Sequence, residues 1–164
     1  FSVKCDPKQL YMRFDADKLS KVIVNLLYNA IKFTPAGGHI ELKLEHKEND
    51  KIRIIVTDDG IGIPEGALDK VFERFYQVEN ADNGIDQGSG IGLHLAKEFV
   101  ILHGGEMWAE HVTGGGSRFI VVIPCEQEES LSEDNEEQLH DEEIMEDVDE
   151  IVALEKDSHE NNMP

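Results

Sequence analysis

The chain has 164 residues, of which 40% are apolar, which is enough for one sizeable core and too little for two domains of average size. Its net charge is −20, but residues 126–164 hold 17 acidic residues and one lysine, a net charge of −16. Residues 1–125 keep 18 acidic and 14 basic residues, about −4. The acidic charge of the whole chain therefore does not exclude a polyanionic ligand such as a triphosphate from this first part.

Cys5 and Cys125 are the only cysteines, and neither has a metal-ligand spacing with a histidine. Free thiols fit a reducing cytoplasm. No apolar run approaches the roughly 18 residues that span a bilayer, and no signal-peptide pattern opens the chain. We therefore expect a cytoplasmic domain.

The first half of the chain predicts a strand, a helix and a hairpin. Residues 10–14 alternate apolar and polar side chains, as a half-buried strand does, and Asp15 and Asp17 supply helix N-cap chemistry. Between residues 18 and 33, apolar side chains recur every three or four positions, which predicts a long amphipathic helix. Two strands with period-two alternation follow at residues 39–46 and 51–58, joined by polar turn residues.

The second half begins with a break at Gly60, Gly62 and Pro64. Four features follow it: a short helical stretch around Leu68–Tyr76, a polar mobile loop at 79–90, a helix at 90–105 with a glycine C-cap, and a strand pair at 106–112 and 116–124. Hairpins separated by helices predict an α+β fold, a two-layer sandwich with helices on one face of a mixed, mostly antiparallel sheet.

Residues 126–164 differ in kind, because their high charge and low hydrophobicity cannot bury enough surface to offset chain entropy. We expect one domain at 1–125 and a mostly disordered acidic linker at 126–164. Within the linker, the spacing of Ile144, Val148, Ile151 and Val152 would suit a short helix that docks on a partner.

Asn25, Asn29 and Lys32 follow one another at intervals of four and three residues, so they share one face of the predicted helix. An amide oxygen is a suitable ligand for Mg²⁺, and an ammonium group suits a phosphate. The alternative is an ordinary solvated helix face.

Asp58 begins the segment DDGIGIP at the end of an apolar strand, where a carboxylate stands beside glycines that allow close approach to the backbone. Asp58 could accept a hydrogen bond from an exocyclic amine. The alternative is a strand-ending turn, in which Asp and Gly are common.

The segment GSGIGL (88–93) opens a helix, where free backbone N–H groups and the helix dipole favour phosphate oxygens. The alternative is a flexible hinge. The spacing matches neither a dinucleotide fingerprint nor a Walker A loop, which excludes both classes of nucleotide site.

These segments occur in the order found in one family. The chain resembles the catalytic, ATP-binding domain of sensor histidine kinases, in the superfamily of gyrase, heat-shock chaperone, histidine kinase and mismatch-repair ATPases. The resemblance covers about 70% of the chain, and the amino-acid sequence of residues 93–108 is similar to that of hybrid two-component sensors. Its boxes are NLLYNAIKFTP (25–35), DDGIGIP (58–64), FERFYQ (72–77) and GSGIGL (88–93).

The resemblance implies the Bergerat ATP-binding fold, with ATP and Mg²⁺ as cofactors. It implies that Asn29 coordinates Mg²⁺ and that Asp58 accepts the adenine amine. Many relatives have a basic residue, able to touch the terminal phosphate, where Gln77 stands. Here either Arg74, one helical turn earlier, replaces it or that contact is absent. The other residues that it places at the nucleotide are Asn25, Lys32, Phe33, Gly60, Gly62, Ile63, Tyr76, Gly88, Ser89, Gly90, Ile91, Gly92 and Leu93.

The resemblance also implies a reaction that this segment cannot complete alone, because the phosphoacceptor histidine of the family lies on a separate helical dimerisation domain. His140 lacks the family's later polar residue and proline, and we expect His39, His94, His103 and His111 to be structural or exposed. The expected partners are that helical domain before Phe1 and a receiver domain after Pro164, within a membrane-anchored homodimer, and no nucleic acid.

Two alternatives stay open. One is an ATP-hydrolysing conformational clamp, whose members carry a Glu general base where Asn25 stands. The other is a nucleotide-binding module without phosphoryl transfer.

Overall fold

The computed structural model describes residues 1–6, 14–47, 50–78 and 89–125. The chain divides into two units, residues 1–128 and 129–164, and all described residues belong to the first. In chain order the elements are β1 (Ser2–Asp6), α1 (Ala16–Phe33), β2 (Ile40–Lys47), β3 (Lys51–Asp58), the 3-10 turns η1 (Glu65–Ala67) and η2 (Lys70–Phe72), α2 (Gly92–Leu102), β4 (Glu106–His111) and β5 (Ser117–Pro124).

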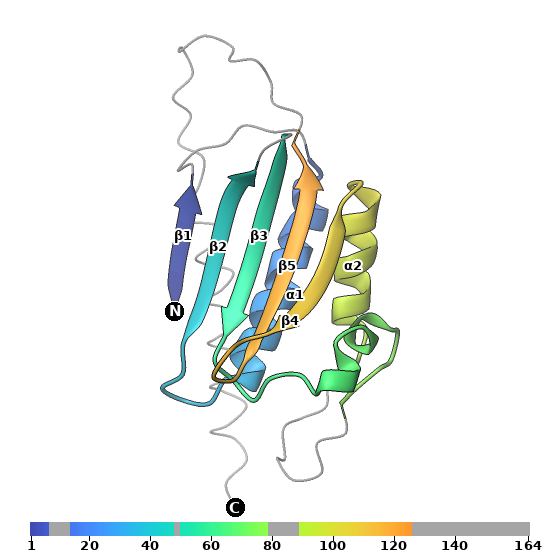
Figure 1. Cartoon of the computed structure of the whole chain (residues 1–164). Helices are drawn as coiled ribbons and strands as arrows, with labels where there is room; N and C mark the ends of the chain where they lie inside the picture. Colours follow the sequence, from blue (N-terminus) through green and yellow to red (C-terminus); the bar gives the residue numbers. More distant parts are fainter. Residues whose placement is uncertain (7–13, 48–49, 79–88, 126–164) are drawn as a thin grey trace, which may run out of the picture. The chain divides into compact units, whose positions relative to one another are not determined.

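The strands form one sheet in the order β1-β2-β3-β5-β4. The β1–β2 pair is parallel, and the other three pairs are antiparallel. Figure 1 shows α1 and α2 next to each other on the same face of this sheet. The prediction of an α+β sandwich with a mixed, mostly antiparallel sheet is therefore confirmed.

The core lies between the two helices and one face of the sheet. Period-two alternation directs every second residue of β3 to this face, and the register opposes Ile54 to Val121 and Val56 to Phe119. Helix α1 contributes five buried residues at three- and four-residue spacing, the amphipathic pattern expected from its sequence. They are Leu19, Val22, Leu26, Leu27 and Ala30.

The start of α1 is capped and is joined to the end of α2. The Lys18 backbone N–H donates to Asp15 Oδ1 at 3.0 Å, which is the expected N-cap bond. His103 Nδ1 lies 2.7 Å from the Phe99 carbonyl, and the Asp15 backbone N–H lies 3.3 Å from His103 Nε2. Nδ1 must therefore carry the proton while Nε2 accepts, a role that matches the structural one expected of His103.

The sequence misplaced two elements in the described residues. The first described strand is β1, where Val3 and Cys5 alternate with polar residues, and it was not predicted. The helical stretch expected around Leu68–Tyr76 was wrong in extent, because only the short turn η2 forms. Glu73 ends this turn with an extended ψ of 144°, and the φ of 65° at Phe75, in the left-handed region, also cannot continue a right-handed helix.

Several predictions concern residues outside the described ranges: most of the strand at 10–14, most of the loop at 79–90, and the linker with its segment from 144 to 152. Within the described ranges, no helix combines the length and the apolar character needed to cross a membrane.

Candidate functional site

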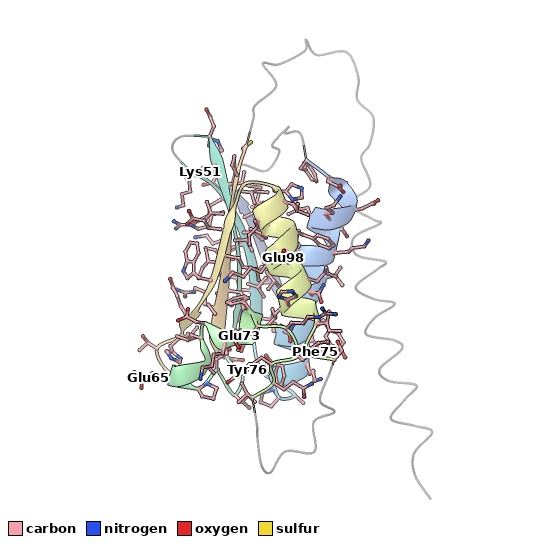
Figure 2. All side chains as sticks on the ribbon, turned by 90° about the vertical axis from the view of Figure 1, so that its right-hand side faces the viewer. Lys51, Glu65, Glu73, Phe75, Tyr76 and Glu98 are labelled. Atoms are coloured by element: carbon pink, nitrogen blue, oxygen red, sulfur yellow. The ribbon has the colours of Figure 1, made fainter. Side chains whose placement is uncertain are left out.

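The predicted site residues gather at one end of the helix layer. In Figure 1, the C-terminal ends of α1 and β3, the 3-10 turns and the start of α2 all lie at the lower end of the domain. Figure 2 shows Glu73, Phe75 and Tyr76 at this end and Lys51 at the opposite end. The fold therefore brings three separate motifs together.

Asp58 is the one acidic side chain buried in the described core, with an exposed fraction of 3%. Its Oδ1 accepts the backbone N–H groups of Gly60 at 3.0 Å and of Ser117 at 3.2 Å. Both bonds fall on Oδ1, so Oδ2 remains an acceptor for a ligand. Burial raises the pKa of Asp58, while the two backbone hydrogen bonds act against this rise.

The β4–β5 turn supplies a part of the Asp58 environment that sequence reasoning missed. Gly116 is buried, and a Cβ atom placed on it would collide with the Asp58 carbonyl oxygen. Ser117 donates its N–H from a position 59 residues away in the sequence. The run of three glycines at 114–116 was the available signal, because such a run marks close backbone approach as well as a turn.

Phe33 and the segment after Asp58 join the end of α1 to the end of β3. The Ile61 N–H donates to the Phe33 carbonyl at 3.1 Å. A Cβ atom on Gly60 would collide with the same carbonyl, so a glycine at this position is required by packing within the protein. Gly62 approaches the β4–β5 turn, with its Cβ position 3.2 Å from the Gly116 carbonyl oxygen, and Ile63 is half-buried.

Asn25 lies against the start of α2, and Asn29 follows it one turn later on the same helix. Each amide donates to the carbonyl four residues earlier at 2.7 Å, Asn25 to Lys21 and Asn29 to Asn25. These bonds engage the nitrogen atoms and leave the amide oxygens as acceptors. A Cβ atom on Gly92 would collide with Asn25 Oδ1, so the N-terminal turn of α2 lies directly against this amide.

The start of α2 has backbone donors to offer. Ile91 is its N-cap residue and makes no side-chain capping bond, although the Ile91 N–H lies 3.4 Å from Ser89 Oγ. The first N–H groups of any α-helix lack acceptors within the helix. Gly92, half-buried Leu93 and the following residue therefore present N–H groups suited to an anion.

The cationic side chains of the site stack on aromatic rings. The Lys32 Nζ atom lies 5.6 Å from the Phe33 ring centroid, and the Arg74 Cζ atom lies 4.7 Å from that of Phe75. Gly90 meets this region too, because its carbonyl accepts the Phe75 N–H at 2.9 Å. Tyr76 and Gln77 are half-buried beside them, and Gly88 lies outside the described residues.

The residues present fit a magnesium ion that is held jointly with phosphates. The described part of the chain has no cluster of three or more His, Cys, Asp or Glu side chains that could hold a metal by itself. Asn29 instead offers one neutral amide oxygen, because its hydrogen bond to the Asn25 carbonyl uses only the amide nitrogen. Mg²⁺ commonly takes one or two protein ligands and completes its shell with phosphate oxygens and water.

Residues 14–127 match the model of a family described as histidine kinase-, DNA gyrase B-, and HSP90-like ATPase. Sensor histidine kinase WalK of Bacillus subtilis is 39% identical over 123 residues, which is 74% of this chain and 20% of WalK. Hybrid signal transduction histidine kinase D of Dictyostelium discoideum is 38% identical over 128 residues, 76% of this chain and 8% of that protein.

Solved structures agree with these relatives. The catalytic domain of histidine kinase ThkA, in a nucleotide-free form, superposes with a TM-score of 0.66 at 30% identity. The match covers 76% of this chain and 78% of the solved catalytic-domain chain. The mycobacterial sensor histidine kinase MprB gives 0.65 at 29% identity, covering 77% of this chain and 82% of MprB's. The chain spans about a fifth of the length of WalK, so it corresponds to one domain of such proteins. It belongs to the histidine kinase-, DNA gyrase B-, and HSP90-like ATPase family.

Proposed function

We propose that this domain binds Mg-ATP and donates the γ-phosphoryl group to a histidine on a separate helical domain of the parent protein. The observation that carries the proposal is the meeting of three groups at one end of the fold. Asp58 Oδ2 is an acceptor for the adenine amine, Asn29 Oδ1 is a ligand for Mg²⁺, and the uncapped start of α2 is a donor set for phosphates. Each of these groups matches one part of the nucleotide.

The remaining predicted residues take their roles from this placement. Lys32, Arg74 and the Asn25 amide would contact phosphates, and Gly88 and Ser89 to Leu93 would surround them. When bound, Mg²⁺ supplies charge neutralisation at the phosphates, and the chain supplies positioning. The predicted residues that would line the base and ribose are Phe33, Gly60, Gly62, Ile63, Tyr76 and Gln77.

The composition of α1 favours transfer to a histidine over hydrolysis by water. A clamp ATPase needs a general base beside the γ-phosphate, which a carboxylate can be and an amide cannot. Helix α1 places the Asn25 amide against the start of α2, and its only acidic residue, Asp17, lies in the first turn at the far end. The helix therefore has no carboxylate near the site to activate water.

An apolar surface beside the phosphate end suits docking of the helical domain. Phe75 has an exposed fraction of 61% and Leu95 of 39%, and both are large apolar side chains next to Gly90 or the first turn of α2. A helix that carries the phosphoacceptor histidine could pack there and reach the γ-phosphate.

We also propose that the catalytic domain spans residues 1–125 and that residues 126–164 are an acidic linker. In this proposal the parent protein is a membrane-anchored homodimer with a receiver domain after the linker.

The test mixes the domain with γ-labelled Mg-ATP and a separately produced helical domain bearing the phosphoacceptor histidine. Acid-labile, alkali-stable label on that histidine is expected, and it should disappear when Mg²⁺ is chelated. Replacing the histidine with glutamine is the control, and it should leave nucleotide binding intact while no label appears.

Two other outcomes would contradict the proposal in different ways. Release of free phosphate without labelled histidine would identify an ATP-hydrolysing clamp. Nucleotide binding with neither product would identify a catalytically silent module.

A further inference from the structure

His94 makes a long-range hydrogen bond that the proposed roles leave unexplained. It lies in the first turn of α2, two residues after Gly92, and its Nδ1 atom lies 3.1 Å from the backbone carbonyl of Phe72 in η2. A carbonyl oxygen only accepts hydrogen bonds, so His94 Nδ1 carries the proton. The bond joins the start of α2 to a turn 22 residues earlier in the chain.

Phe72 is a fixed anchor for this bond. Its side chain is 5% exposed, and its ring packs edge-on against Phe119 with centroids 6.2 Å apart. The Lys97 Nζ atom lies 4.6 Å from the Phe72 ring centroid. His94 and Lys97 are three residues apart and so share one face of α2, which holds η2 at two points.

The residues just after η2 need such support. Phe75 has a φ of 65°, a conformation that a bulky residue keeps only when its surroundings impose it. Its N–H donates to the Gly90 carbonyl at 2.9 Å, and a Cβ atom on Gly90 would lie 2.9 Å from the Phe75 carbonyl carbon. The position of Arg74 therefore depends on how η2 is held against α2.

We infer that His94 is a positioning residue whose Nδ1–H, by holding the Phe72 carbonyl, aligns Arg74 with the backbone donors at Gly92 and Leu93. The inference rests on the proposed function for its role at the phosphates, since both aligned groups would contact the terminal phosphate. The base end is untouched, because Asp58 takes its hydrogen bonds from Gly60 and Ser117. His94 should therefore matter more for ATP than for ADP.

The first experiment needs no nucleotide. Amide hydrogen exchange at Phe75 is measured in the full 164-residue chain for wild type, His94→Ala, His94→Asn and His94→Gln. Asn places its amide nitrogen close to the position of Nδ1, whereas Gln places it nearer to Nε2. His94→Ala should raise exchange about fivefold to tenfold, the effect of one hydrogen bond, and Asn should restore protection where Gln does not.

His111→Ala is the matched control, because His111 is an exposed histidine at the end of β4 and should leave exchange at Phe75 unchanged. Thermal unfolding of each variant checks that it is folded. Unchanged exchange in His94→Ala, or equal rescue by Asn and Gln, would overturn the inference whether or not the domain is a kinase.

The second experiment compares dissociation constants for Mg-ATP and Mg-ADP by calorimetry. In wild type the ratio of the two constants measures how much the terminal phosphate contributes to binding. His94→Ala should raise the dissociation constant for Mg-ATP about fivefold relative to that for Mg-ADP. Equal weakening of both nucleotides would overturn the positioning role. If wild type binds neither nucleotide, the proposed function fails, and the exchange experiment alone decides whether His94 holds η2.

Discussion

The two ends of the candidate site differ in how far they are assembled before a nucleotide arrives. At the base end, Asp58 is buried and already accepts two backbone N–H groups, and Gly116 packs against its carbonyl. At the phosphate end, Arg74 stacks on a neighbouring ring, and α2 starts without a side-chain cap. At the base end Asp58 Oδ1 already has its hydrogen-bond donors and only Oδ2 is left for a ligand, whereas the first N–H groups of α2 have no acceptor within the helix.

This difference indicates how binding free energy is distributed. A preformed base site loses little conformational entropy on binding, so it can set selectivity for the nucleotide. In the proposed binding mode, Arg74 and Lys32 would leave the aromatic rings over which they lie, so their phosphate contacts would form only with a bound triphosphate. We expect mutations at the base end to change folding and affinity, and mutations at the phosphate end to change transfer.

The largest effect is expected for Gly116→Ala at the base end. The added Cβ collides with the Asp58 carbonyl, and Gly116 has a φ of 90°, which strains any L side chain. We expect a loss of about 3 kcal/mol in the free energy of unfolding, measured by urea denaturation. Gly66→Ala is the control, because nothing lies within 4 Å of its Cβ position. Comparable stability of the two variants would show that the close packing of Gly116 on Asp58 is not required for folding.

Asn29→Ala should have the next largest effect, on catalysis. Loss of the proposed Mg²⁺ ligand should lower the rate of transfer to histidine about 100-fold and raise the Mg²⁺ concentration required. Tyr28→Ala, at an exposed position beside it on α1, is the control and should leave both unchanged. Identical Mg²⁺ titration curves for Asn29→Ala and wild type would exclude Asn29 as a ligand.

Asp58→Asn separates affinity from stability. The amide keeps an oxygen for Gly60 and Ser117 but presents N–H where the adenine amine needs an acceptor, so affinity for ATP should fall about 10- to 100-fold in calorimetry. Unchanged affinity would show that the base is held in another way.

The same variant gives a pH dependence. Burial raises the pKa of Asp58, so the folded state binds this proton more tightly than the unfolded chain does, and ionisation of Asp58 lowers stability at neutral pH. Asp58→Asn should therefore have a higher Tm than wild type at about pH 7. The difference should shrink as the pH falls through the raised pKa toward about 3.9, the value for an unfolded aspartate. A difference that grows toward acid pH would contradict the sign.

The smallest effect is expected for Arg74→Ala. Arg74 is exposed and its described contact is the stacking on Phe75, so unfolding should change by about 0.5–1 kcal/mol at most. Transfer should fall about two- to fivefold, the range for a solvent-exposed ion pair. Glu73→Ala, the exposed neighbour, should not slow transfer. A larger loss of ADP than of ATP affinity in Arg74→Ala would place this residue away from the terminal phosphate.

Local patterns in the sequence were sufficient to predict the helices and the hairpins, whose backbone hydrogen bonds join residues that are close in the sequence. Apolar spacing predicted α1, the β2–β3 hairpin, α2 and the β4–β5 pair to within two or three residues at each end. The parallel edge strand β1 was missed because its pairing partner, β2, lies 39 residues away and a five-residue strand carries little periodicity. The turn η2 was taken for a longer helix, but Glu73 ends it with an extended ψ of 144°, and Phe75 then adopts a left-handed φ of 65°.

The sequence by itself determined which chemical groups this domain offers: a carboxylate after an apolar strand, amides on a helix, and glycines before another helix. Only the tertiary structure decided what surrounds them. Ser117 and Gly116 complete the Asp58 environment, and His94 holds the Phe72 carbonyl, through contacts between residues 22 to 59 positions apart. Such contacts arise when distant segments pack on a common core, and no local pattern of residues encodes them.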